Sequence, residues 1–298
     1  MKKLFVTSIL LATFSCTLVW SAFSATKNIN NDSKRSIVEE NNLYIPVGYK
    51  KVSSVTAEIF NQAIADVTKI YAPVVSAKGA TLSISGDWND GTVNAYASRS
   101  GKTWKVNLFG GLARHETITP DGFALVICHE LGHHLGGAPK IQNYFNSWAT
   151  NEGQSDYFAT LKCLRKYFEK DNNEQVVANL NVPAYVTSLC EQTHSNREDV
   201  AICKRGAMAG KSVADLFVVL GNVSKVDFST PDPTVVSKTN DSHPAAQCRL
   251  DTYLEGAVCA ANENEDVSDT DVTKGTCTKR NGFTLGLRSR CWYKPTIE

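Results

Sequence analysis

The spacing of apolar residues along the chain predicts both helices and strands. Residues 55–71 carry apolar side chains three and four positions apart, which is typical of a helix with one buried face. Three short runs instead alternate apolar and polar side chains and predict strands: residues 81–85, 93–97 and 103–109. Later apolar stripes predict more helices: residues 147–170, 212–220 and 249–260. We therefore expect an α+β fold in which a mixed sheet precedes a helical C-terminal lobe.

The first 48 residues have the composition of an export signal and a leader. Basic residues open the chain, an apolar run follows over residues 4–20, and Ala22 and Ser24 are small residues suited to signal peptidase. We predict a signal peptide over residues 1–24, with an uncleaved anchor or lipidation at Cys16 as alternatives. The polar residues 25–48 predict a flexible leader, which could be a propeptide. Residues 49–298 would then form the folded domain, and no later stretch is apolar enough to span a membrane.

One predicted helix carries a metal-binding pattern. Thr119 suits the cap, Pro120 suits the first helical position, and glycines at 136 and 137 suit the end. Inside it, His129 and His133 are four residues apart, so both imidazoles lie on one face and can bind one zinc ion. Glu130 lies beside them and can take a proton from zinc-bound water, which is peptide hydrolysis chemistry. The alternative is a pair of core histidines. His134 lies on another face, and we expect it at the surface.

Two later segments offer partners for this site. Glu152 and Asp156 are one turn apart on the helix predicted over residues 147–170. Glu152 is the candidate third ligand, and Asp156 could hold a ligating imidazole by its other nitrogen. The alternative is a solvated acidic face. Further on, His243 and Arg249 could stabilise an oxyanion, or could be a helix cap and a surface arginine.

Charge and cysteine content narrow the class of protein. Loss of residues 1–24 would remove two of the 31 basic residues and none of the 30 acidic ones. The mature chain would therefore have nearly equal numbers of basic and acidic residues, without the excess of positive charge that is typical of nucleic-acid-binding proteins. Eight of the nine cysteines follow the signal, which implies disulfides in an exported chain, with the pairing left open. A buried free thiol at Cys128 is the alternative there, and disulfides are expected to staple the tail from about residue 261.

These residues together resemble the gluzincin metallopeptidases over residues 93–254. The pattern His129-Glu130-x-x-His133 with a later Glu152 and Asp156 is their ligand pattern, and the short gap between ligands is similar to thermolysin. The segment Asn94-Ala95-Tyr96-Ala97 resembles the HtpX and CAAX prenyl protease family. So do Ser242-His243-Pro244 and Arg249. HtpX-type enzymes are usually embedded in membranes and have a longer ligand gap, and this chain departs from both properties.

The resemblance implies a zincin-like fold with an active-site helix, and it implies roles for the residues. Asn94, Ala95, Tyr96 and Ala97 would form an edge strand that pairs with the substrate backbone, and His243 and Arg249 would assist the transition state. We therefore expect an exported zinc endopeptidase of the periplasm or the medium, with one Zn²⁺ per chain and a peptide or protein substrate. The alternative is a catalytically weak zincin-like binding or chaperone module of the cell envelope.

Overall fold

The computed structural model describes residue 1 and residues 34–143 and 147–296. The expected signal peptide, with Cys16 and all its other residues except Met1, lies outside this described part. So do residues 25–33 of the expected leader. Among the described helices, none is both long enough and apolar enough to cross a membrane.

The expected α+β fold is confirmed, and the described sheet is mixed. It contains β1 (Arg35–Ser36), β2 (Thr81–Asp87), β3 (Ala95–Ser100) and β4 (Thr103–Phe109) in the order β1-β3-β4-β2. β3 and β4 form an antiparallel hairpin, whereas β2 runs parallel to β4. Gly101 has a φ of +57° in the hairpin turn, a conformation that glycine adopts without steric cost. The three strands predicted from alternation are therefore present, each within a few residues of its expected position.

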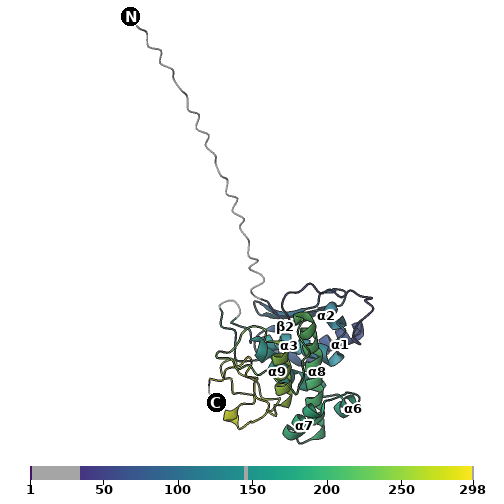
Figure 1. Ribbon diagram of the computed structural model, residues 1–298, viewed down its shortest axis with the longest axis vertical. Coiled ribbons are helices and arrows are strands. Elements are labelled where there is room, and N and C mark those ends of the chain that lie inside the picture. The colour runs from purple at the N-terminus through teal and green to yellow at the C-terminus, as the bar shows by residue number, and fades with distance from the viewer. Residues whose placement is uncertain (2–33, 144–146, 297–298) are drawn as a thin grey trace.

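Helices are the commonest regular structure in the described chain. The first five are α1 (Ala57–Ala77), α2 (Gly110–Arg114), α3 (Pro120–Leu135), α4 (Glu152–Phe158) and α5 (Leu164–Phe168), with the π-helix η1 (Ala159–Cys163) joining α4 to α5. The others are α6 (Asn173–Ala178), α7 (Ala184–Thr193), α8 (Arg197–Gly221), α9 (Ala246–Val258) and the short 3₁₀ helix η2 (Lys279–Asn281). Helices α8 and α9 pack side by side, and α6 and α7 lie at the end of the molecule away from the sheet (Figure 1).

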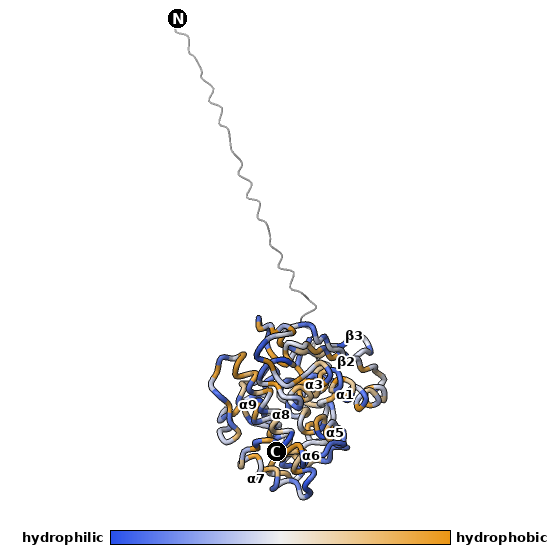
Figure 2. Tube along the Cα trace, turned by 90° about the vertical axis from the view of Figure 1, so that its right-hand side faces the viewer, coloured by the Kyte–Doolittle hydropathy of each residue, from blue (hydrophilic) through white to orange (hydrophobic). Residues whose placement is uncertain are grey.

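Helix α3 lies in the middle of the core. It contacts α1, β3 and β4, which precede it in the chain, and α4, η1 and α8, which follow it. Every residue from Gly122 to Leu135 is buried, as expected for a helix that is apolar nearly all round. Figure 2 shows hydrophobic residues gathered around α3 inside the molecule. Thr119 caps it by accepting a hydrogen bond from the Gly122 amide, so the predicted start is confirmed.

The second predicted helix begins later than the sequence indicated. Residues 147–170 were expected to be helical, but α4 begins at Glu152 because the Asn151 side chain caps the Gln154 amide. Residues before it are extended enough for Thr150 to pair with Lys140. Glu152 is therefore the first residue of its helix, where a carboxylate is favoured by the helix dipole.

Part of the segment expected to be a flexible leader packs against the core, although most of its described residues are exposed. Ile37, Val38 and Ile45 are buried in the main core. β1 pairs with β3, and the Ile45 amide donates to the Gly91 carbonyl. The mean composition of residues 25–48 is polar, and this concealed three apolar side chains that the fold buries.

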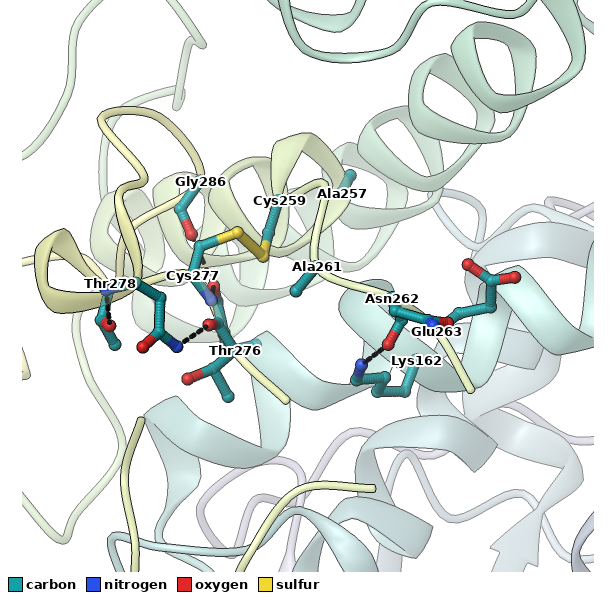
Figure 3. The surroundings of a disulfide bond; sticks show 12 residues. Lys162, Ala257, Cys259, Ala261, Asn262, Glu263, Thr276, Cys277, Thr278 and Gly286 are labelled. Atoms are coloured by element: carbon teal, nitrogen blue, oxygen red, sulfur yellow. Dashed lines mark hydrogen bonds between the residues drawn. A yellow bond between two sulfur atoms is a disulfide. The ribbon is translucent and has the colours of Figure 1, made fainter. Parts of the chain in front are cut away.

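All eight cysteines after residue 24 form disulfides, which confirms the disulfide prediction. The pairs are Cys128–Cys163, Cys190–Cys203, Cys248–Cys291 and Cys259–Cys277. The alternative of a free thiol at Cys128 is wrong, because η1 brings Cys163 against α3. Two of the bridges staple the C-terminal tail, as expected: one begins at Cys248 in α9 and the other at Cys259, directly after it. Figure 3 shows one of them, Cys259–Cys277, beside the hydrogen bond that Lys162 donates to the Asn262 carbonyl.

Candidate metal centre

His129 and His133 present the same ring nitrogen to one point in the interior. Both side chains are fully buried, and their ring centroids are 4.8 Å apart. His133 Nδ1 lies 2.8 Å from the Thr150 carbonyl oxygen, and His129 Nδ1 lies 2.7 Å from Asp156 Oδ1. A proton on each Nδ1 satisfies these contacts and leaves each Nε2 with a free lone pair.

Glu152 completes a group of three on the neighbouring helix. Its Oε2 atom lies 3.2 Å from His129 Nε2 and 3.6 Å from His133 Nε2. Helices α3 and α4 come this close because Gly132 faces Ser155, where an added Cβ would lie 3.1 Å from the Ser155 Cα. The Cys128–Cys163 disulfide also ties α3 to the helix that follows α4. The predicted third ligand therefore lies where the sequence analysis expected it.

These three residues can hold a metal ion. Their ligand atoms all lie within 4.8 Å of one another. In the described chain, His129 Nε2, His133 Nε2 and Glu152 Oε2 are buried side-chain atoms that make no hydrogen bond. Burying three polar atoms without partners is costly, and a cation among them would remove that cost. A second group, Asp232 with Cys248 and Cys291, is less suitable because its two cysteines are bonded to each other.

Glu130 lies next to this group and is also fully buried without a hydrogen-bond partner. Burial raises the pKa of Glu130 to about 8, and the charge of Glu152 acts in the same direction against that of His129. Burial would raise the pKa of Glu152 as well, but the charges of His243 and His133 hold it well below its usual range. The two carboxyl groups therefore differ: Glu152 is suited to stay ionised as a ligand, and Glu130 to take up a proton.

Asp156 is the centre of a buried polar network that orients His129. Arg249 donates to both of its carboxylate oxygens, at 2.7 and 2.8 Å, and Tyr253 donates to Oδ1 at 2.6 Å. Burial alone would raise the pKa of Asp156, but the Arg249 and His129 charges lower it. The predicted contact between Asp156 and a ligating histidine is present. Tyr253 was not predicted to belong to the site, although it lies four residues after Arg249 and therefore on the same face of α9.

His134 was expected at the surface, and this prediction is wrong. It is 2% exposed and stacks between Trp104 and Trp148, at centroid distances of 5.4 and 5.0 Å. Burial lowers the pKa of His134 to about 3. It lies on the sheet side of α3, where Nε2 contacts the Lys105 carbonyl, so it is separate from the metal group.

His243 and Arg249 both reach the site, but they contact different groups there. His243 Nε2 lies 3.4 Å from Glu152 Oε2 and 2.6 Å from the Ser36 carbonyl oxygen. Arg249 uses two nitrogens on Asp156 and donates with the third to the Ile37 carbonyl, at 2.6 Å. The alternative of a surface arginine is excluded, since Arg249 is 2% exposed.

The segment Asn94–Ala97 leads into β3, which contacts the helix α3 that carries the two histidines, but β3 is not an edge strand in the described chain. β1 pairs with it on the outer side, where Arg35 lies opposite Ala97 and Ser36 opposite Tyr96. Arg35 also bonds to Glu152 through Nη2. The sequence analysis missed Arg35 and Ser36 because they lie in a polar stretch more than ninety residues before the motif.

No family model, no curated protein and no solved structure matched this chain when it was compared with known proteins. The geometry of the site is therefore what indicates the function of this protein.

Proposed function

We propose that this protein is an exported zinc-dependent endopeptidase. One observation supports it above the others: three unpartnered, buried ligand atoms face one another, directly beside the unpartnered carboxylate of Glu130. Two imidazole nitrogens and one carboxylate form the open, three-ligand set of catalytic zinc sites, whereas structural sites are closed by four ligands.

The distances in the group fit zinc. Zinc bonds of about 2.0–2.2 Å in a tetrahedron place neighbouring ligand atoms about 3.4 Å apart. Glu152 Oε2 lies 3.2 and 3.6 Å from the two Nε2 atoms. Both histidines also have the oxygen partners on Nδ1 that are usual for zinc ligands, namely the Thr150 carbonyl and Asp156.

The residues of the chain divide the work of peptide hydrolysis. Bound zinc supplies a Lewis acid that polarises the peptide carbonyl and lowers the pKa of water. Glu130 accepts the proton of the attacking water and returns it to the leaving amine. His243 donates to the oxygen of the scissile carbonyl as negative charge develops there. Arg249 binds the next carbonyl along and orients Asp156, so it is a positioning residue.

The disulfides support export. All eight cysteines after residue 24 are paired, and such bonds persist in the periplasm or outside the cell, where thiols become oxidised. An enzyme exported to such a compartment would meet peptide or protein substrates there.

The test uses two variants of the purified, zinc-loaded protein. Glu130→Gln should keep about one zinc per chain and lose casein hydrolysis, because an amide cannot accept the proton. Glu255→Gln is the matched control, since it changes a largely buried glutamate of α9 outside the site. It should keep both zinc and activity.

The alternative function, a zincin-like binding or chaperone module with little turnover, predicts a different result. Wild-type protein would then carry zinc but fail to cut casein, and Glu130→Gln would be indistinguishable from it. Protein that contains no transition metal, when prepared without chelators, would contradict both functions.

A further inference from the structure

The N-terminal residues of the described chain lie along the strand expected to bind substrate. Arg35 and Ser36 form β1, which pairs antiparallel with β3 opposite Ala97 and Tyr96. The next amide, that of Ile37, donates to the Ala95 carbonyl at 3.2 Å. Lys34 lies over the Tyr96 ring, 4.6 Å from its centroid. An extended peptide added to a sheet edge in this way is a common mode of peptide recognition.

The Ser36 carbonyl points at His243, one of the candidate catalytic residues. Its oxygen is 2.6 Å from His243 Nε2, the same nitrogen that lies 3.4 Å from Glu152 Oε2. On the preceding residue, the Arg35 guanidinium bonds to the other oxygen of Glu152. Both partners of the His243 ring, Ser36 and Glu39, offer oxygen acceptors, so Nε2 donates to the Ser36 carbonyl.

The carbonyl groups of the two residues after Ser36 also accept hydrogen bonds from side chains. Arg249 donates to the Ile37 carbonyl at 2.6 Å, and Asn94 Nδ2 donates to the Val38 carbonyl at 3.3 Å. The Ile37 side chain is fully buried and Val38 is 5% exposed. Three successive carbonyls therefore each have a side-chain donor, and the Ile37 side chain fills a buried apolar site.

We propose that residues 34–39 lie in the cleft as the protein's own substrate, and that the protein cuts its own chain between Ser36 and Ile37. This inference rests on the proposed peptidase function. The oxygen of a water molecule adds to the Ser36 carbonyl carbon while Glu130 takes one of its protons. The bond from this carbon to the Ile37 nitrogen then breaks, and Glu130 returns the proton to that nitrogen. The products are a carboxylate on Ser36 and an amino group on Ile37, with one water consumed.

The cut would uncover the outer edge of β3, where other peptides could pair with it. The segment from Ile37 onward stays bound to the core, because Ile45 is buried and its amide donates a hydrogen bond to the Gly91 carbonyl. Residues up to Ser36 are released, and their pairing with Tyr96 and Ala97 is lost. β3 then has a free outer edge at these two residues, as the resemblance to known peptidases implied.

Intact mass and N-terminal sequencing test the proposal on the full chain, expressed with its signal and purified with zinc. Wild-type protein should begin at Ile37. Glu130→Gln should retain Ser36 and residues before it, even when mixed with excess wild-type protein, because each chain holds the bond in its own cleft. Cleavage of Glu130→Gln between Ser36 and Ile37 in that mixture would overturn the intramolecular cut.

Casein hydrolysis measured on the same samples separates this inference from the proposed function. Wild-type protein that hydrolyses casein but still carries an intact Ser36–Ile37 bond overturns the self-cleavage and leaves the peptidase function standing. Zinc-loaded protein that cuts neither casein nor itself contradicts both.

Two further variants test the position of the cut. Ile37→Asp should stop it, because a carboxylate would have to enter a fully buried apolar site. Val47→Asp is the matched control, since Val47 is 55% exposed in the same segment, and it should be cut like the wild type. Cleavage of Ile37→Asp at the wild-type rate would show that Ile37 does not select the bond.

Discussion

At the scale of single residues, the site is specified by which atom of each side chain is left free. Asp156 and the Thr150 carbonyl occupy the Nδ1 atoms of His129 and His133, so only the Nε2 atoms face the metal position. Glu152 similarly offers Oε2 to the group while Oε1 contacts Arg35. Replacing Asp156 or Arg35 would therefore change the orientation of a metal-binding side chain while leaving that side chain in place.

His243 and Arg249, which the sequence grouped together, should respond differently to substitution. In zinc-loaded protein, His243→Ala should lower kcat for a peptide by about 10²–10³-fold with little change in KM or melting temperature. Its hydrogen bonds are to a main-chain oxygen and to the exposed Glu39, and bound zinc would replace its charge beside Glu152, so the fold depends little on it. An unchanged kcat would remove His243 from the site.

Arg249→Ala should instead lower the stability of the protein. It leaves Asp156 buried without its main counter-charge, and breaking a buried ion pair in this way costs about 3–5 kcal/mol. Lys211→Ala is the matched control, because the Lys211–Asp215 pair lies one turn apart on α8 and is partly exposed. Its loss should cost about 0.3–0.5 kcal/mol. Urea melts of both variants measure the difference, and equal losses would contradict a structural role for Arg249.

At the scale of elements, the site depends on how two helices cross. The absence of a side chain at Gly132 lets α3 lie against Ser155 of α4, and the Cys128–Cys163 disulfide holds the same pair of segments. Helix α9 packs on both α4 and α8 and supplies Arg249 and Tyr253 to the network around Asp156. The C-terminal tail is in turn bonded to α9 through Cys248 and Cys259.

Helix α9 also gives a prediction on pH. Burial raises the pKa of Glu255 to about 7, against a weaker opposing effect of the Gly286 amide. The folded protein then binds this proton more tightly than the unfolded chain, so stability falls as pH rises from about 4.5 to about 7 and stays lower above that. Glu255→Gln does not titrate. It should be more stable than wild type by about 1–3 kcal/mol at pH 8 and equal to it at pH 4. Denaturant melts at the two pH values check this, and an equal difference at both would exclude the charge as its cause.

At the scale of the whole molecule, one buried centre connects the two halves of the chain. The strands and α1 precede the metal helix, and α4 to α9 follow it, so α3 is shared by both. The N-terminal segment crosses this boundary: Arg35 contacts Glu152, and Ile37 contacts Arg249. A ligand at the metal position would therefore stabilise contacts between distant parts of the sequence.

Removal of the metal should lower the melting temperature of the wild-type protein. An ion that binds only the folded state stabilises it by about 4 kcal/mol at a thousand times its dissociation constant. His133→Ala lacks one ligand, so its melting temperature should be the same with and without a chelator. Calorimetry of both proteins, with the disulfides intact, checks the prediction. An equal response in the two proteins would show that the chelator acts elsewhere.

The sequence by itself determined three of the four described strands and the residues that could hold a metal ion. Thr119 and Pro120 mark the start of α3, and the four-residue spacing of His129 and His133 defines a shared helix face, because both signals are local. Alternation located the three longer strands for the same reason. Glu152 could be predicted from its type and its pairing with Asp156, although its helix begins later than its apolar stripe suggested.

Only the tertiary structure decided what comes together over long distances in the chain. The pairing of Cys128 with Cys163, the burial of His134 between two tryptophans, and the position of Arg35 to Val38 beside β3 all depend on contacts that no local pattern encodes. Residues 34–38 have no sequence signal of their own. They are ordered because an unpaired strand edge and a buried apolar site happen to lie beside them in the fold, and this is the physical reason why a segment of polar composition becomes part of the candidate active site.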